Sequence, residues 1–316
     1  MNLLRPVLRR FSPAGQDVKL SILIFHRVFP SPDPIFPGEP EARWFDRMLR
    51  NVGHWFNVLP LDEAVAMLGA GCLPERSMAI TFDDGYADNY SVALPILKRH
   101  RMSATFFIAT SFLDGGRMWN DTVVEAVRQS TSSSLDLTGL GLGSFRIGTN
   151  AEKRSAIEVI LGKIKYLEPA ERLKLTGRIA LVAGVKLPDD LMMTTEEVVQ
   201  MARAGMQIGA HTMSHPILAN LGSAEAREEI VGSKVILERE LAMRVGLFAY
   251  PNGKPDSDYS PKDVEIVRSA GFDAAVTTCA GVAGKDSDRF QLPRFTPWDR
   301  SMWRFGARLA QNIVQG

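Results

Sequence analysis

The 316-residue sequence has few of the features that mark several large classes of protein. It contains only two cysteines, Cys72 and Cys279, which are too few for a disulfide framework, so a reducing compartment is the simpler expectation. The formal net charge is +1 at pH 7, which offers no electrostatic surface for a nucleic acid. No run of about 20 apolar residues is present, so we expect no transmembrane segment.

The N-terminal residues also lack the pattern of an export signal. Residues 3–11 are basic and apolar, but arginines and a proline interrupt them before the roughly 7–15-residue hydrophobic core of a signal peptide could form. We therefore expect a leader over residues 1–17 and a protein that is cytoplasmic or at the inner membrane surface. Peripheral association of this leader with an anionic membrane is one interpretation, and a disordered or packed leader is the other.

Strand-like and helix-like patterns alternate along most of the chain. With 45% hydrophobic residues, the chain is long enough for one large globular domain, and no internal repeat or oligomer signal is present. The pattern predicts helices between successive strands, and the strands are expected at residues 18–25, 78–82, 105–109, 206–210, 245–250 and 274–278. Such alternation indicates an α/β fold of parallel strands with covering helices.

One segment interrupts this alternation. Residues 110–194 contain two or three helical patterns, separated by a Ser/Thr/Gly-rich patch at residues 130–143. We predict a helical insertion at about residues 115–193, which is a lid, a substrate-contacting subdomain or only a structural excursion. A last helical segment is predicted over residues 298–316.

Two polar motifs indicate catalysis. Asp83 and Asp84 directly follow the apolar run 78–82, and His211 and His215 stand four residues apart, which fits one face of a helical turn. Two imidazoles and one carboxylate bind a divalent cation and leave positions open for water and substrate. The second carboxylate is then free to act as a base. Either motif alone is commonly structural, since an Asp-Asp-Gly sequence is often only a turn.

These motifs resemble those of polysaccharide deacetylases with the NodB homology domain, carbohydrate esterase family four. Residues 81–85, Thr-Phe-Asp-Asp-Gly, match the first motif, and residues 211–216, His-Thr-Met-Ser-His-Pro, are similar to the second. Residues 248–253 resemble the third in a variant form, and residues 292–294 a late segment of one subgroup. The likeness spans roughly residues 18–297 and implies a distorted, incomplete (β/α) barrel as the fold.

The resemblance also implies roles for individual residues. Asp84, His211 and His215 would be the metal ligands, and Asp83 would be the general base. The backbone N–H after the third motif's proline, which falls on Asn252, would stabilise an oxyanion, with Tyr250 of the same motif beside it. Zinc is the first expectation for the metal, although the spacing also permits iron, cobalt, nickel or manganese.

The sequence departs from the common family pattern at two positions. Ala249 stands where most members have an arginine that orients the base, and Arg294 is the best substitute because its guanidinium can hold Asp83 with two hydrogen bonds. A surface or structural ion pair is the alternative role for Arg294. No histidine follows residue 215, so the late histidine that protonates the leaving amine in many members is missing. His26 resembles the N-terminal histidine of a permuted subgroup and is the predicted acid.

The sequence therefore predicts a metal-dependent hydrolase that removes N-acetyl groups from N-acetylhexosamine units of a poly- or oligosaccharide or a lipid-linked glycan. Two alternatives remain open. One is a deacylase that acts on another sugar-linked amide with the same residues. The other is a sugar-binding pseudoenzyme, which the missing late histidine and Ala249 would fit.

Overall fold

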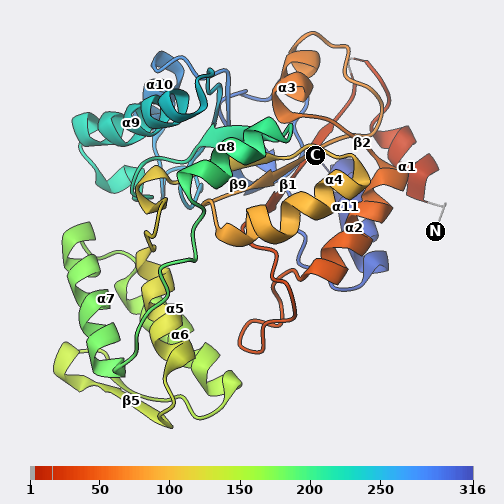
Figure 1. Cartoon of the computed structure of the whole chain (residues 1–316). Coiled ribbons are helices and arrows are strands. Elements are labelled where there is room, and N and C mark those ends of the chain that lie inside the picture. Colours follow the sequence, from red (N-terminus) through yellow and green to blue (C-terminus); the bar gives the residue numbers. More distant parts are fainter. Residues whose placement is uncertain (1–3, 16, 316) are drawn as a thin grey trace.

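The computed structural model describes residues 4–15 and 17–315 and is built around one parallel sheet (Figure 1). The strands follow the order β1-β3-β4-β7-β8-β9-β10, and the short β2 pairs with β3. All of these pairings are parallel. Their bounds are β1 Leu20–Phe25, β2 Asn57–Val58, β3 Ser77–Phe82, β4 Thr105–Ile108, β7 Gln207–Ala210, β8 Leu247–Ala249, β9 Ala274–Ala280 and β10 Leu292–Arg294.

The two edges of this sheet come together. The Ile24 amide donates to the Phe295 carbonyl at 3.1 Å, and the Phe295 amide donates to the Ile22 carbonyl at 2.7 Å. These bonds join β1 to the chain just after β10, so the sheet is nearly closed into a barrel, which confirms the predicted fold class. The pattern did not predict β10, because Pro293 removes a backbone donor and the register of β10 on β9 shifts at this point.

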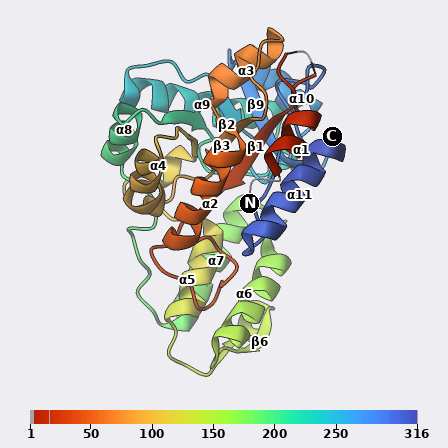
Figure 2. The ribbon, with the colours of Figure 1, turned by 90° about the vertical axis from the view of Figure 1, so that its right-hand side faces the viewer.

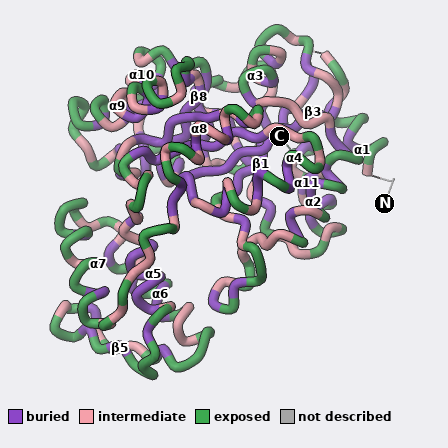
Figure 3. The backbone as a smooth tube through the Cα atoms, viewed as in Figure 1, coloured by how far each residue is buried: buried purple, intermediate pink, exposed green. Residues whose placement is uncertain are grey.

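Alternate residues of the strands face two different cores. The barrel interior is filled by apolar side chains such as Ile22 and Phe107, and helix α3 (Leu61–Gly69) closes one end of it. The outward residues, such as Phe82 and Phe106, pack beneath the covering helices. These are α2 (Ala42–Trp55), α4 (Leu94–His100) after the π-helix η1 (Asn89–Ala93), α8 (Thr195–Arg203), α9 (Ser223–Leu241) and α10 (Pro261–Ser269). The strands therefore form the buried centre of the molecule (Figure 3).

The predicted insertion region forms a helical layer that extends from one end of the barrel (Figures 1 and 2). It contains α5 (Trp119–Gln129), β5 (Ser134–Leu137), β6 (Gly143–Arg146), α6 (Asn150–Ile164) and α7 (Pro169–Ala183), and it has its own apolar core. The β5-β6 hairpin was not predicted, because its serines and glycines resemble a loop; Leu135 and Leu137 are nevertheless buried in alternation. The loop after β1 reaches this region, where Asp33 pairs with Arg128 at 2.8 Å.

Helices from the two ends of the chain pack side by side (Figures 1 and 2). They are α1 (Leu4–Phe11) and α11 (Met302–Gln315). A Cβ at Gly306 would lie 2.5 Å from Leu4 Cδ1, so this glycine lets the two helices approach closely. Parts of the predicted leader, residues 1–3 and 16, lie outside the described residues. Among the described residues, no helix combines the length and the apolar character needed to cross a bilayer.

Candidate active site

The polar motifs meet at the carboxyl ends of the barrel strands. Asp83 and Asp84 follow β3, His211 follows β7 and His26 follows β1, and parallel strands bring these ends to one face of a barrel. The structure gathers these residues around one cavity of about 530 Å³. The cavity is lined by His26, Arg27, Glu39, Asp83, Asp84, Tyr86, Met118, Trp119, Asn120, Leu161, Gly162, Lys165, Arg172, His211, His215, Ile217, Asn252 and Thr278.

Several residues at the site have a left-handed backbone. The φ angles of Asp84, Thr212, His215 and Asn252 are 78°, 64°, 54° and 58°. Non-glycine residues seldom adopt such angles, and they persist where surrounding contacts hold them. The histidine pair is therefore carried by a loop after β7 and not by the helical turn that its spacing suggested. Glu229 of α9 holds this loop, because its carboxylate accepts the backbone amides of residues 213 and 214 at 2.8 Å each.

Asp84, His211 and His215 form a cluster that can hold a metal ion. The Asp84 Oδ1 atom lies 3.4 Å from Nε2 of each histidine, and it is buried without a hydrogen-bond partner among the described residues. Two ligands about 2.1 Å from one ion at a tetrahedral angle would themselves be about 3.4 Å apart. The Nδ1 atom of His211 is 2.7 Å from the Ala249 carbonyl, to which it donates, so its Nε2 lone pair faces Asp84. This donor set fits a divalent cation.

The charges at the cluster favour a cation as well. Burial raises the pKa of Asp84, but the neighbouring His211 and His215 outweigh burial and hold that pKa well below its usual value. Burial lowers the pKa of His215 to about 4, so this imidazole is neutral at pH 7 and able to be a ligand. Burial also lowers the pKa of His211, but the carboxylates of Asp84 and Asp83 outweigh it and give a net rise. Together these shifts indicate that the carboxylates of Asp83 and Asp84 are ionised and would attract a cation.

Asp83 is held by Arg294 deep inside the barrel. The guanidinium donates from Nη1 to Oδ1 at 2.7 Å and from Nη2 to Oδ2 at 2.6 Å, and both residues are almost completely buried. Two further donors of Arg294 are used as well, since Nε donates to the Thr277 carbonyl at 2.7 Å and Nη1 to the Thr81 hydroxyl at 3.1 Å. Burial raises the pKa of Asp83, but the charges of Arg294 and His211 outweigh it, so the net pKa is lowered. The carboxylate is therefore ionised and fixed in direction.

The other predicted site residues are placed differently from one another. His26 is solvent-exposed and lines the cavity, as does Asn252, whose backbone N–H makes no hydrogen bond within the described ranges. Tyr250 does not line the cavity as predicted. Its side chain is fully buried in the outer core, and its ring stacks on Tyr259 with centroids 3.9 Å apart. Tyr250 follows Ala249 by one residue, and the strand alternation that turns Ala249 into the barrel turns Tyr250 away from it.

Sequence patterns missed several residues of the cavity. Glu39 comes from the loop after β1, and burial raises the pKa of its carboxyl group. Lys165 and Arg172 come from the insertion. No local pattern marks these side chains, because only the long-range packing of the insertion against the barrel brings them to the site. Tyr86 directly follows the first motif, and its position in the same turn was the one available signal.

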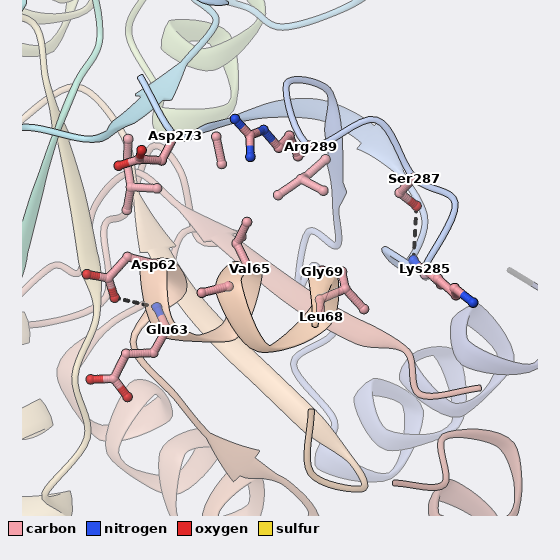
Figure 4. Close-up of a pocket in the computed structure, with 14 residues that line it drawn as sticks. Asp62, Glu63, Val65, Leu68, Gly69, Asp273, Lys285, Ser287 and Arg289 are labelled. Atoms are coloured by element: carbon pink, nitrogen blue, oxygen red, sulfur yellow. Dashed lines mark hydrogen bonds between the residues drawn. The ribbon is translucent and has the colours of Figure 1, made fainter. Parts of the chain in front are cut away.

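A second cavity of about 530 Å³ lies at the other end of the barrel (Figure 4). It is lined by residues of α3 and by Leu247, Ala274 and Leu292, which stand at the starts of β8, β9 and β10. Its charged lining residues include Asp62, Glu63, Asp273, Lys285 and Arg289. None of the predicted site residues lines it, whereas His26, Asp83, Asp84, His211, His215 and Asn252 all line the first cavity.

Comparisons with known proteins agree on one family. The family model for polysaccharide deacetylase matches residues 70–275. A Bacillus subtilis (strain 168) protein, YxkH, named as a candidate polysaccharide deacetylase, is 23% identical over 280 residues, which are 88% of this chain and 71% of that protein.

Solved structures agree on the fold. The deacetylase PplD from Streptococcus pyogenes, solved in complex with acetate, superposes with a TM-score of 0.62 at 20% identity, covering 94% of this chain and 98% of that one. IcaB from Ammonifex degensii gives 0.60 at 20% identity, covering 96% and 98%. At these identities the two structures establish the likeness of the fold alone.

Proposed function

Because this chain belongs to the polysaccharide deacetylase family, and is therefore a hydrolase of carbon–nitrogen bonds, we propose that it removes N-acetyl groups from N-acetylhexosamine units of a poly- or oligosaccharide or a lipid-linked glycan. The observation that carries this proposal is the pairing of Asp83 with Arg294 directly beside the Asp84, His211 and His215 cluster. A fixed, ionised base next to a cation site is the arrangement that amide hydrolysis requires.

We propose that Asp84, His211 and His215 hold the metal ion, with zinc as the first candidate and iron, cobalt, nickel or manganese as alternatives. A divalent ion in this position supplies Lewis-acid chemistry and makes water more acidic. The buried, unpartnered Oδ1 of Asp84 and the backbone carbonyl that orients His211 support these assignments.

The chain's own side chains then divide the proton transfers. Asp83 takes a proton from the water that attacks the acetyl carbonyl carbon, and Arg294 keeps Asp83 ionised and aimed. The free N–H of Asn252 donates to the oxygen that becomes negatively charged. As the carbon–nitrogen bond breaks, His26 gives a proton to the leaving amine, so that acetate and an amino sugar are released.

The test is acetate release from a panel of N-acetylglucosamine oligomers, with metal content measured on the same samples. We expect release from the wild-type protein, loss of release with Asp83→Asn, and loss of both metal and release with Asp84→Asn. His26→Ala should lower release while metal binding is kept. Tight oligomer binding by metal-loaded protein without acetate release would instead favour a pseudoenzyme. Faster release from formylated than from acetylated substrates would favour a different deacylase.

We further propose that the protein works in the cytoplasm at the inner membrane surface, which it reaches through α1 and α11. These helices contain no acidic residue, and they expose four apolar side chains: Val7, Phe11, Trp303 and Val314. Arg10 and Arg304 are exposed on the same two helices, and neither has an ion-pair partner in the described part of the chain. Tryptophan and arginine together are typical of helices that lie at an anionic lipid surface.

A further inference from the structure

One wall of the active-site cavity comes from the insertion and carries positive charge. Lys165, between α6 and α7, and Arg172, in the first half of α7, line the cavity together with Trp119 of α5. The opposite wall is formed by the ends of the barrel strands, with Asp83 and Asp84 among its residues. The cavity volume of about 530 Å³ lies within the range of ligand sites, roughly 300–1,000 Å³. A glycan in this cavity would therefore contact both walls.

Arg172 is fixed in position, but its charge is not neutralised. Its guanidinium lies 4.6 Å from the centre of the Trp119 ring, and its Nη1 donates to the Lys165 carbonyl at 2.6 Å. The residue is only 6% exposed, and its Nε is buried without a hydrogen-bond partner among residues 4–15 and 17–315. Burial lowers the pKa of Arg172, although a guanidinium remains charged in a protein. Such a group gains from an anion that supplies the missing acceptor.

Lys165 also lacks a counter-charge. Neither Lys165 nor Arg172 has a carboxylate oxygen within 4.0 Å among the residues that the structure describes. The third cation of the cavity is different, because Arg27 pairs with Asp88 at 2.7 Å. The carboxylate of Glu168 raises the pKa of Arg172, but by less than burial lowers it. The insertion thus places two cations in the cavity that have no ion-pair partner among the described residues.

The carboxylates on the opposite wall of the cavity do not neutralise the charges of Lys165 and Arg172. Asp83 is already neutralised by Arg294, and Asp84 belongs to the cluster that fits a metal ion. Glu39 remains; burial raises the pKa of its carboxyl group, and the cations named as opposing this rise are His26, Arg300 and Arg27, not Lys165 or Arg172. The positive charge of Lys165 and Arg172 is therefore available to a ligand.

We infer that Lys165 and Arg172 form an anion-binding subsite that holds a carboxylate or phosphate group of the glycan, close to the sugar that carries the acetamido group. This inference rests on the proposed function, since it names the substrate class of the same cavity. Arginine and lysine beside an aromatic ring offer several donors to either anion. Glycans with a uronic acid and glycans with a sugar phosphate both present this chemistry. A chain that is already deacetylated carries ammonium groups and would be repelled.

The test compares three oligosaccharides that share one N-acetylglucosamine core: a neutral one, one with a terminal uronic acid and one with a terminal phosphate. Acetate release gives KM and kcat for each. We expect an anionic substrate to have a KM about tenfold below that of the neutral one, because hydrogen bonds to charged groups are strong, while kcat changes little. Of the two anionic substrates, the one with the lower KM shows whether the subsite prefers a carboxylate or a phosphate.

Lys165→Gln should remove most of this preference, so that the anionic and neutral substrates have similar KM values. Lys174→Gln is the matched control, because Lys174 lies on α7 with its side chain exposed and outside the cavity. Arg172→Lys keeps the charge and should retain part of the preference. Equal KM values for neutral and anionic substrates in the wild-type protein, or a preference that survives Lys165→Gln in folded protein, would overturn the inference.

A binding measurement separates this inference from the proposed reaction. Asp83→Asn protein, loaded with metal, is titrated calorimetrically with the same three oligosaccharides, and no turnover is needed. Tighter binding of an anionic oligosaccharide, weakened by the added Lys165→Gln change, supports the subsite even if no acetate is ever released. Equal affinity for all three contradicts the subsite even if acetate release is observed.

Discussion

At the scale of single residues, the buried pair of Asp83 and Arg294 sets the properties of the site. Removing one partner of a buried ion pair leaves an uncompensated charge, which costs about 3–5 kcal/mol. The guanidinium of Arg294 also reaches Thr81 and the Thr277 carbonyl, so it ties β10 to β3 and β9 as well as orienting the base. A change at Arg294 therefore affects both the direction of the carboxylate and its pKa.

Arg294→Lys should lower kcat/KM and move the acid limb of its pH profile to higher pH. In the folded protein the pKa of Asp83 is below its usual value, so the base is ionised above that pKa and is lost as the pH falls through it. Lysine offers a single ammonium group in place of a guanidinium that donates two hydrogen bonds to the carboxylate, so the pKa of Asp83 rises. The measurement is kcat/KM against pH, with Arg289→Lys at the remote cavity as control. A lower rate with an unshifted acid limb would contradict this role for Arg294.

Some residues of the site could be predicted from the sequence, and others could not. Asp84, His211 and His215 were placed together because their two motifs follow strand-like segments and resemble the metal-binding motifs of one family, and their roles stay predictions. The pairing of Asp83 with Arg294 was predicted although the two residues are 211 positions apart, and the structure shows both hydrogen bonds that the prediction named. Tyr250 was misplaced because a motif gives neighbouring positions without saying which of them faces the site.

At the scale of elements, close contact between β4 and β7 limits the residues that the barrel tolerates. Gly209 of β7 faces the Phe107 ring of β4, and a Cβ at this glycine would lie 2.4 Å from Phe107 Cδ1 and 3.1 Å from the Leu247 carbonyl oxygen. The next and last residue of β7, Ala210, leads directly into His211. The packing of this strand therefore determines where the metal ligands lie.

Gly209→Ala should destabilise the protein by about 1–3 kcal/mol, because the added methyl group overpacks the barrel interior. Gly177→Ala in α7 is the matched control: a Cβ there meets no atom within 4 Å, and alanine favours the helix, so stability should stay equal or rise slightly. Both free energies of unfolding come from denaturant titrations. A Gly209→Ala protein as stable as the wild type would show that Phe107 can move aside.

The sequence predicted most strands of the barrel, but it did not predict β10 or the β5-β6 hairpin. Most strands of the sheet are continuous apolar runs next to helix signals such as the capping box of Thr194 and Glu197, which the structure contains. The exceptions depend on contacts distant in sequence. Strand β10 contains a proline and forms because β9 and β1 lie beside it, and the β5-β6 hairpin is stabilised by the core of the insertion.

At the scale of the whole molecule, the two ends of the chain form one surface. Helices α1 and α11 pack together, so basic and apolar residues that are about 300 positions apart in the sequence share one side of the molecule. The exposed fractions of Val7, Phe11, Trp303 and Val314 are 41%, 42%, 66% and 46%. Neither helix alone presents as large an apolar area, so the sequence of the N-terminal leader could not distinguish a packed leader from a membrane contact.

We expect the 316-residue chain to bind vesicles that contain anionic phosphatidylglycerol and to bind neutral phosphatidylcholine vesicles weakly. The affinity should fall as salt screens the arginines. Trp303→Ser should weaken binding about tenfold, since insertion of a large apolar side chain contributes about 1.5–3 kcal/mol. Leu181→Ser is the control, because Leu181 is 81% exposed on α7, away from this surface. Co-sedimentation with vesicles gives the affinities. If neither vesicle binds and the protein instead forms dimers that Trp303→Ser disrupts, the surface joins two copies of the chain and the membrane proposal fails.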